Sequence, residues 1–284
     1  MNIEIVDVRT PEDTAACHRL ATAIWGAEVG CSSPQMLVHA GYGGVVLLAM
    51  NEGEAIGFLF SFPALYEGKT VLWSHETGIL PDYIHQGLGY QLKLEQRKRA
   101  VTLGYESIVW TFDPLVSRNA FFNLTKLQVG IREYKVNVYG RDAADTINQG
   151  LETDRFIAQW FVNDHTHTPP FADAENSQPV GCFTLIVGPD GRPLTGEDGG
   201  TGTSGAATNS FPENSRFMET DVVYTEIPKD FTELALSQPR QAQAWREAFR
   251  HQAIGLFAND YRPAAYAVYD GRGCYSWRKI GGSH

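Results

Sequence analysis

Two neighbouring residues, His75 and Glu76, carry the side chains best suited to removing a proton near neutral pH. An imidazole needs little adjustment of its pKa for this work, whereas a carboxylate needs burial to raise its pKa. Both lie in an apolar run, residues 71–80, which has strand length and which Pro81 ends. Because consecutive strand residues point to opposite faces, only one is expected to reach a cleft. We expect His75 to be this base, with Glu76 as the alternative; a hydrogen-bonded structural histidine and a solvated carboxylate are the plain explanations.

A glycine-rich loop follows this run, with Gly87 and Gly89 just ahead of residues typical of a helix. Glycines let backbone N–H groups approach an anion, and the first N–H groups of a helix have no acceptor within it. The positive end of the helix favours a phosphate or pyrophosphate. The loop therefore indicates an anion-binding turn, although Gly-x-Gly alone is more often a plain helix start.

Other side chains have weaker signals. Asn119 and Asn123 are four residues apart on a predicted helix and share a face. They would either bind a ligand there, or cap the helix and face the solvent. His165 and His167 have no third ligand nearby, so no metal is expected. Three aromatic residues would line an apolar pocket for an acceptor, or belong to the core: Trp25, Trp73 and Phe112.

The elements that must position these residues alternate over residues 1-162. Strands are expected at residues 3–8, 45–50, 55–62, 71–80, 107–112, 130–138 and 156–162. Helices are expected at residues 15–25 after a cap at Thr10, at 33–39, over about 15 residues between Gly89 and Gly104, and at 117–127. This order predicts a mixed α/β fold, with an antiparallel meander first and a β-α-β unit afterwards.

Residues 163-284 form a predicted C-terminal extension of different composition. A stretch at about 188-215 is rich in Gly, Ser and Thr and is expected to be flexible. Strands are expected on its two sides, at 182–187 and 221–227. A long helix is expected at about 239-257, with Ser237 as its cap, and residues 264–277 are expected to form a final hairpin.

The charge balance excludes some partners. Lys and Arg number 23 and Asp and Glu 33, which gives a net charge of −10. Binding to nucleic acid or to an anionic membrane through non-specific contact needs a cationic surface, so neither is expected. The first residues have neither the basic start nor the apolar core of a signal peptide, and four scattered cysteines do not form a disulfide scaffold. We expect a cytoplasmic protein.

The sequence around the glycine-rich loop resembles the GNAT (GCN5-related N-acetyltransferase) superfamily. The strand, Pro81, the loop and Gly87-x-Gly89 are similar to its motif A, although Ile84 stands at the usual Arg/Gln position and His85 at a frequent Gly. One branch of predicted acyltransferases resembles the chain further, in segments that include Trp110 to Leu115, Ser117 to Ala120, Thr153 to Arg155, Trp245-Arg246 and Arg272 to Tyr275.

The resemblance implies a central, mostly antiparallel sheet splayed at the fourth and fifth strands, flanked by helices and followed by a C-terminal α/β extension. It implies acyl-CoA, of acetyl or succinyl type, as co-substrate, and no metal. The pyrophosphate would bind the loop, and Asn119 and Asn123 would bind the pantetheine arm or the substrate. The 3′-phosphate would meet Lys93, Arg97 and Lys98, unless these lie on a solvated helix face. The implied cofactor-binding backbone and loop residues are Ile79, Leu80, Gln86, Gly87, Leu88, Gly89 and Tyr90.

The implied activity is transfer of an acyl group to the amine of a small molecule, such as an amino acid or a specialised metabolite. Position 75 shares its expected face with 73 and 79, where some members carry the base. Leu124 occupies the place of a frequent catalytic Tyr, and Tyr139 is the substitute acid. A thiol can also leave as thiolate without an acid. The alternatives are a catalytically silent module that binds CoA or a metabolite, and an enzyme with a carrier-protein or aminoacyl-tRNA donor. The expected assembly is a homodimer.

Overall fold

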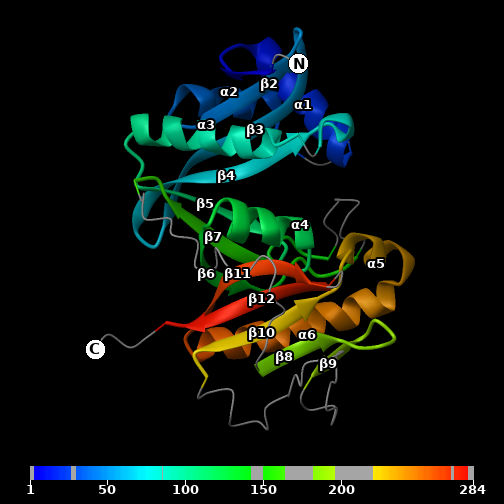
Figure 1. Ribbon diagram of the computed structural model, residues 1–284. Helices are drawn as coiled ribbons and strands as arrows, with labels where there is room; N and C mark the ends of the chain where they lie inside the picture. Colours follow the sequence, from blue (N-terminus) through cyan, green and yellow to red (C-terminus); the bar gives the residue numbers. More distant parts are fainter. Residues whose placement is uncertain are drawn as a thin grey trace. The chain divides into compact units, whose positions relative to one another are not determined.

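The computed structural model describes residues 3–26, 30–84, 86–141, 150–163, 182–195, 220–269 and 272–280 (Figure 1). Its contacts divide the chain into two compact units. The N-terminal unit comprises Met1–Thr111, Ala144–Thr146 and Gln159–His165, and the C-terminal unit comprises Phe112–Ala143, Ile147–Ala158 and Thr166–His284. Because the units interleave along the sequence, the boundary expected between residues 162 and 163 stays a prediction.

The strands of the N-terminal unit follow the apolar runs of the sequence. They are β1 Ile3–Asp7, β2 Val45–Asn51, β3 Glu54–Tyr66, β4 Lys69–Ile79 and β5 Ser107–Phe112, of which Phe112 counts with the C-terminal unit. Strands β1 to β4 pair antiparallel in sequence order, and β5 pairs with β4 in parallel. Tight turns join β2 to β3 and β3 to β4, and each has two residues with positive φ, as a type I′ hairpin needs.

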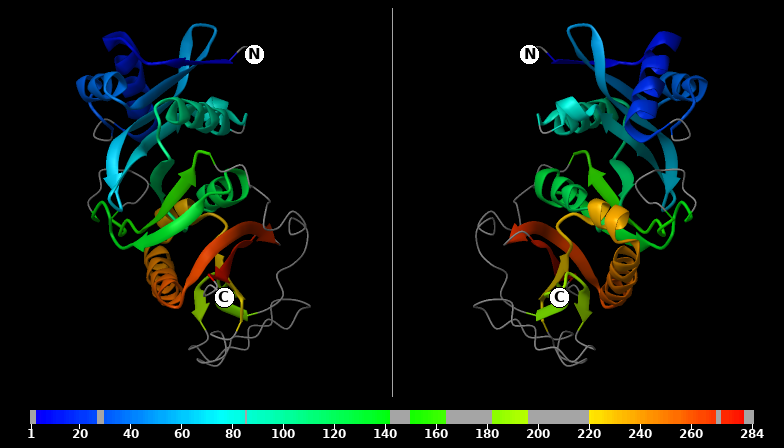
Figure 2. Two further views of the ribbon diagram at one scale, coloured as in Figure 1. Left: turned by 90° about the vertical axis from the view of Figure 1, so that its left-hand side faces the viewer. Right: turned by 90° about the vertical axis from the view of Figure 1, so that its right-hand side faces the viewer.

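Helices cover both faces of these strands. The bounds are α1 Pro11–Trp25, α2 Ser33–Gly41 and α3 Leu88–Thr102. Helices α1 and α2 lie on one face and α3 on the other (Figure 2). Helix α1 begins in the expected way, because Thr10 and Asp13 each accept a hydrogen bond from the other's backbone N–H. Gly104, with φ of 82°, follows the end of α3.

The middle of the chain departs from the expected elements. The helix expected at 117–127 forms as α4, Ser117–Ala120, followed by a π-helical segment η2, Phe121–Lys126. Strand β6, Gly130–Lys135, ends three residues before the expected end, and β7 spans Arg155–Phe161. The wider π-helical turn breaks the spacing of four that α-helical periodicity assumes.

A second sheet lies in the C-terminal unit. Its strands are β8 Cys182–Val187, β9 Pro193–Thr195, β10 Val222–Ile227, β11 Tyr261–Tyr269 and β12 Arg272–Lys279. Their order is β11-β12-β10-β8-β9, and only β10 and β8 pair in parallel among the described residues. The expected final hairpin is thus formed by β11 and β12. The short β9 lies inside the stretch expected to be flexible, of which residues 196–215 lie outside the described residues.

Two helices, α5 Phe231–Ser237 and α6 Pro239–Ala258, accompany this sheet. Helix α6 packs Trp245 and Phe249, both fully buried, toward the sheet, where Phe249 contacts Tyr275 and Trp277 of β12. The expected cap of this helix is wrong: Ser237 is the last residue of α5, and Gln238 precedes α6 without a side-chain cap. Pro239 begins α6 because a proline needs no N–H partner at that position.

The predicted fold class is confirmed. Among the described residues the larger sheet has the order β1-β2-β3-β4-β5-β7-β6, mostly antiparallel with a parallel β4–β5 pair, and the C-terminal sheet is separate from it. This is a mixed α/β arrangement, and the fourth and fifth strands pair over only two register positions before they separate, as the expected splay requires.

Candidate active site

Strands β4 and β5 separate soon after they meet. They share two register pairs, Leu72 with Ile108 and Trp73 with Val109, whereas β4 continues to Ile79. We call the point beyond Trp73 and Val109 the strand fork. Among the described residues, the edge of β4 toward β5 has no register partner from Ser74 to Ile79. The backbone groups of β4 that point away from β3 are therefore available to a ligand there. The backbone of Leu80 is less available, because its N–H donates to Ile56 O at 3.0 Å and its carbonyl accepts from Tyr83 N–H at 2.9 Å.

A β-bulge places His75 and Glu76 on the same face. In the register with β3, Phe60 is opposite Glu76 and Ser61 is opposite Ser74, so His75 is an extra residue on β4. The His75 ring contacts those of Phe60 and Phe62, and Glu76 accepts a hydrogen bond from Cys31 N–H. Both side chains therefore face α1 and α2. The expectation of opposite faces was wrong, because the bulge interrupts the alternation on which it depends.

The two side chains have complementary titration properties. His75 Nε2 lies 3.6 Å from Glu76 Oε1, with the side chains 38% and 10% exposed. Burial, and secondarily the charge of His39, lowers the pKa of His75. Burial raises the pKa of Glu76 to about 7, although the Cys31 N–H bond opposes the change. Near neutral pH the imidazole is thus free to accept a proton, while the carboxylate begins to ionise.

The other Glu76 oxygen is available for an interaction. Oε1 accepts from Cys31 N–H at 3.1 Å, whereas Oε2 is buried and has no hydrogen-bond partner among the described residues. A buried, unsatisfied carboxylate oxygen is costly. It is therefore positioned for a partner such as a ligand or a water.

Aromatic rings surround this pair. Trp73 is half-buried and is paired with Phe62 across β3 and β4, so it lies on the same face as His75. Trp25 at the end of α1 contacts Phe58 edge to face, with ring centroids 5.8 Å apart. The roles of Trp25 and Trp73 in an acceptor pocket stay predictions. Phe112 belongs to the C-terminal unit, where it is buried against Phe156 with centroids 5.7 Å apart, as a core residue would be.

The glycine loop forms a helix start without a side-chain cap. A short 3₁₀ turn, η1 Pro81–Tyr83, follows β4, and Gly87 precedes α3 with φ of 75°, a left-handed conformation that favours glycine. The backbone N–H groups of Leu88, Gly89 and Tyr90 thus begin the helix with no acceptor inside it. Leu88 is buried and packs inward, so it would offer a ligand its backbone alone.

Nearby side chains contribute little charge to this helix start. Gln86 is exposed and donates to Asp82 O at 3.4 Å. Ile84 and Tyr90 are also exposed, and neither side chain supplies a positive charge to the turn. Anion binding at the turn would therefore depend on backbone N–H groups. His85 lies outside the described residues.

Besides Phe112, three predicted site residues belong to the C-terminal unit. Asn123 is buried and donates from Nδ2 to Asn119 O at 2.9 Å, a local bond typical of an asparagine that satisfies the backbone. Tyr139 is 48% exposed, lies beneath the Arg155 guanidinium and donates from its backbone to Thr153 Oγ1. The roles of Asn119, Asn123 and Tyr139 stay predictions.

A buried ion cluster explains several residues of the motifs. The Asp113 carboxylate accepts from both terminal nitrogens of Arg246, at 2.9 and 2.5 Å, and from Arg155 at 3.3 Å. Burial alone would raise the pKa of Asp113, but the two guanidinium groups hold it below its usual range. Beside them, Asp154 accepts two bonds from Arg250 at 2.8 Å each and one from Tyr134. These motif residues therefore have a structural role within the C-terminal unit.

Lys93 lies in a different environment from the one that the sequence predicts. It was expected on a solvated helix face or at a phosphate, but it is 4% exposed, and Nζ lies 2.8 Å from Ser74 Oγ. Helix α3 carries charged residues around its circumference, so its sequence does not mark which of them turns inward. The sequence therefore does not predict that Lys93 is buried among uncharged partners.

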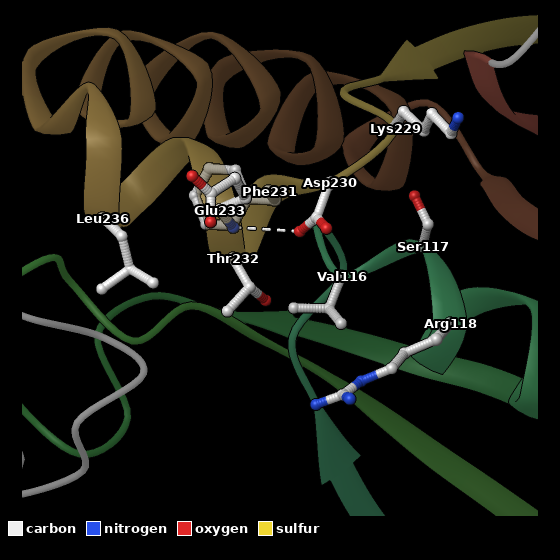
Figure 3. A pocket seen from close by; sticks show the side chains of 9 residues that line it. All are labelled: Val116, Ser117, Arg118, Lys229, Asp230, Phe231, Thr232, Glu233 and Leu236. Carbon is white, nitrogen blue, oxygen red and sulfur yellow. Dashed lines mark hydrogen bonds between the residues drawn. The ribbon is translucent and has the colours of Figure 1, made fainter. Parts of the chain in front are cut away.

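A pocket of about 290 Å³ opens elsewhere, in the C-terminal unit (Figure 3). Arg118 and Lys229 contribute positive charge to its lining, and Asp230 accepts from Glu233 N–H at 2.9 Å. It is lined by Val116, Ser117, Arg118, Lys229, Asp230, Phe231, Thr232, Glu233 and Leu236, none of them a predicted site residue. In Figure 3 the Arg118 and Lys229 side chains point in different directions, so they do not converge on one ligand.

Comparisons with solved structures return acetyltransferases. The ribosomal-protein-S18-alanine N-acetyltransferase from Escherichia coli is similar, with 13% identity and a TM-score of 0.46, over 59% of this chain and 98% of its own. An acetyltransferase of the GNAT family from Streptococcus pneumoniae has 15% identity and a TM-score of 0.46, over 56% and 99% of the two chains. YncA of Salmonella typhimurium, a putative acetyltransferase solved with acetyl-CoA, has 16% identity and a TM-score of 0.46, over 58% and 96%.

No family model matches the sequence, and no curated protein matches it. Within the described ranges, no helix has the length and apolar composition needed to cross a membrane. The histidines His165 and His167 lie outside the described residues.

Proposed function

We propose that the protein is an N-acyltransferase that moves an acetyl- or succinyl-type group from acyl-CoA to the amine of a small molecule, such as an amino acid or a specialised metabolite. One observation carries the proposal: the bulge brings His75 and Glu76 to one face, beside an edge of β4 that pairs with no other strand among the described residues. An open strand edge can hold the amides of a pantetheine arm, and the adjacent pair can manage a proton.

The reaction divides its tasks among these groups. The acceptor nitrogen attacks the thioester carbonyl, and His75 takes the proton that the nitrogen releases. Ionised Glu76, 3.6 Å from His75, stabilises the imidazolium. Backbone N–H groups on the open edge of β4 stabilise the oxyanion. When the carbonyl re-forms, the C–S bond breaks, its electron pair stays on sulfur, and CoA leaves as the thiolate, so that Tyr139 is not required as an acid.

The start of α3 fits the diphosphate of CoA. Gly87 provides the left-handed turn, and a Cβ at Gly87 would have no heavy atom within 4 Å, so the approach is open. Uncapped N–H groups at the helix start attract a pyrophosphate without a side-chain cation. The side chains of the loop are therefore secondary to its backbone.

Calorimetric titration of the purified chain with CoA, acetyl-CoA and succinyl-CoA tests this proposal. We expect a micromolar Kd for at least one acyl-CoA, and the preferred acyl group will identify the donor. His75→Ala should keep this affinity and lose turnover. If the wild-type protein binds none of the three compounds, the proposal is overturned. If it binds one of them but transfers the acyl group to no amine, the protein is a silent binding module instead.

A further inference from the structure

The amine of Lys93 lies at the strand fork. Ser74 and Trp110 are the first residues of β4 and β5 beyond the last register pair. Lys93 Nζ donates to Ser74 Oγ at 2.8 Å and lies 4.0 Å from the centroid of the Trp110 ring. It also donates to Gln96 Oε1, one turn along α3, at 3.3 Å. One amine thus joins the helix after the glycine loop to both strands where they separate.

This arrangement is costly for stability. Lys93 is 4% exposed, Ser74 is 5% exposed and Gln96 is fully buried. The polar partners of the amine are uncharged, and burial lowers its pKa to about 7. An amine buried without a carboxylate loses more hydration than two neutral hydrogen bonds return. A methionine of similar length would fill the same space without this cost.

The polar cluster at the fork is also incomplete. Gln96 Nε2 is buried and has no hydrogen-bond partner among the described residues, while Gln96 Oε1 is held by Lys93. Native structures leave few buried donors unpaired, and such groups suggest a missing partner. The cluster therefore has an unused donor inside the protein, where an enclosed water would satisfy it.

We propose that Lys93 is a positioning residue that fixes Ser74 and the fork, so that the next residues, His75 and Glu76, are correctly placed for acyl transfer. The inference rests on the proposed function. Lys93 acts through its neighbours: its bond to the Ser74 side chain holds the side of the bulge nearest the fork, and its contact with the Trp110 ring holds β5 at the point where it leaves β4.

The test compares Lys93→Met with wild type and with Lys69→Met, a control on β4 whose side chain is 73% exposed. We expect Lys93→Met to have a higher Tm at pH 7, because the buried amine is gone, yet a kcat lower by about 10- to 100-fold, as expected when reacting groups are misplaced. KM for the acceptor should change less than about threefold. Ser74→Ala should lower kcat similarly, and the double variant should lose little more.

A second readout does not depend on activity. The folded state binds a proton at Lys93 less tightly than the unfolded chain, so wild type gains stability as pH rises from 7 toward 10. Lys93→Met lacks this gain, and the difference in Tm between the two should narrow over that range. Lys69→Met should follow wild type throughout.

The outcomes separate the two proposals. If the wild-type protein neither binds nor uses acyl-CoA, the proposed function is overturned, and this inference is overturned with it. Wild type that is active while Lys93→Met is equally active overturns this inference alone. A variant whose Tm and kcat fall together, with kcat restored when measured well below its Tm, assigns Lys93 to stability and also overturns it.

Discussion

One extra residue in β4 changes which groups can act together at the candidate site. Regular alternation would have separated His75 from Glu76, whereas the bulge puts both against α1 and α2. Burial then shifts their pKa values in opposite directions, down for the imidazole and up for the carboxylate. The result is a pair in which the neutral base and a partly ionised carboxylate coexist near pH 7. Their apparent titration belongs to the pair.

The pH dependence of the reaction follows from this pair. We expect kcat/KM to rise with pH and level off above about 7, because only ionised Glu76 stabilises the imidazolium. Glu76→Gln should abolish the rise of kcat/KM near pH 7 and lower its plateau value. His75→Ala should lower the plateau value of kcat/KM by about 10²- to 10⁴-fold. Steady-state rates between pH 5.5 and 9 measure this. A limb near pH 7 that survives in Glu76→Gln would contradict the assignment.

At the scale of elements, local signals were sufficient for some features and failed for others. Thr10, Pro11 and Gly104 mark helix ends through bonds and dihedral angles made within a few residues, so α1 and α3 were predictable. The bulge at His75 was not, because it depends on how β4 pairs with β3. The inward turn of Lys93 was not predictable either, since it depends on the residues of β4 and β5 that pack against α3.

The start of α3 provides the prediction at this scale. Gly87→Ala places a Cβ in a left-handed turn, which costs about 1 kcal/mol of unfolding free energy and tilts the first N–H groups. We expect the Kd for acyl-CoA to rise about tenfold by calorimetry. Gly68→Ala is the matched control, because Gly68 has nearly the same φ, 76°, and equally open surroundings in the β3–β4 turn. The control should lose similar stability and keep its affinity; equal losses of affinity would show that the effect is not local.

At the scale of the whole molecule, charged residues that are far apart in the sequence form ion pairs with one another. Arg246 binds Asp113 across 133 residues, and Arg250 binds Asp154 across 96. Both links lie inside the C-terminal unit, where they join residues from the middle of the chain to α6. Sequence spacing cannot reveal such pairs, because neither partner has a local reason for its identity. Ion pairs therefore connect α6, which follows β7 in the sequence, to residues that follow β5, such as Asp113.

The last prediction concerns this tie. Arg246 is fully buried, and removing one partner of a buried pair leaves the other charge poorly compensated. Arg246→Met should lower the free energy of unfolding by about 3–5 kcal/mol in urea titrations of the full chain, even though Arg155 still contacts Asp113. Arg192→Met is the control, since its pair with Asp190 is exposed and should change stability by no more than about 0.5 kcal/mol. If the two variants unfold at the same urea concentration, the cluster does not hold the C-terminal unit together, and Asp113, Arg155 and Arg246 need an explanation in binding instead.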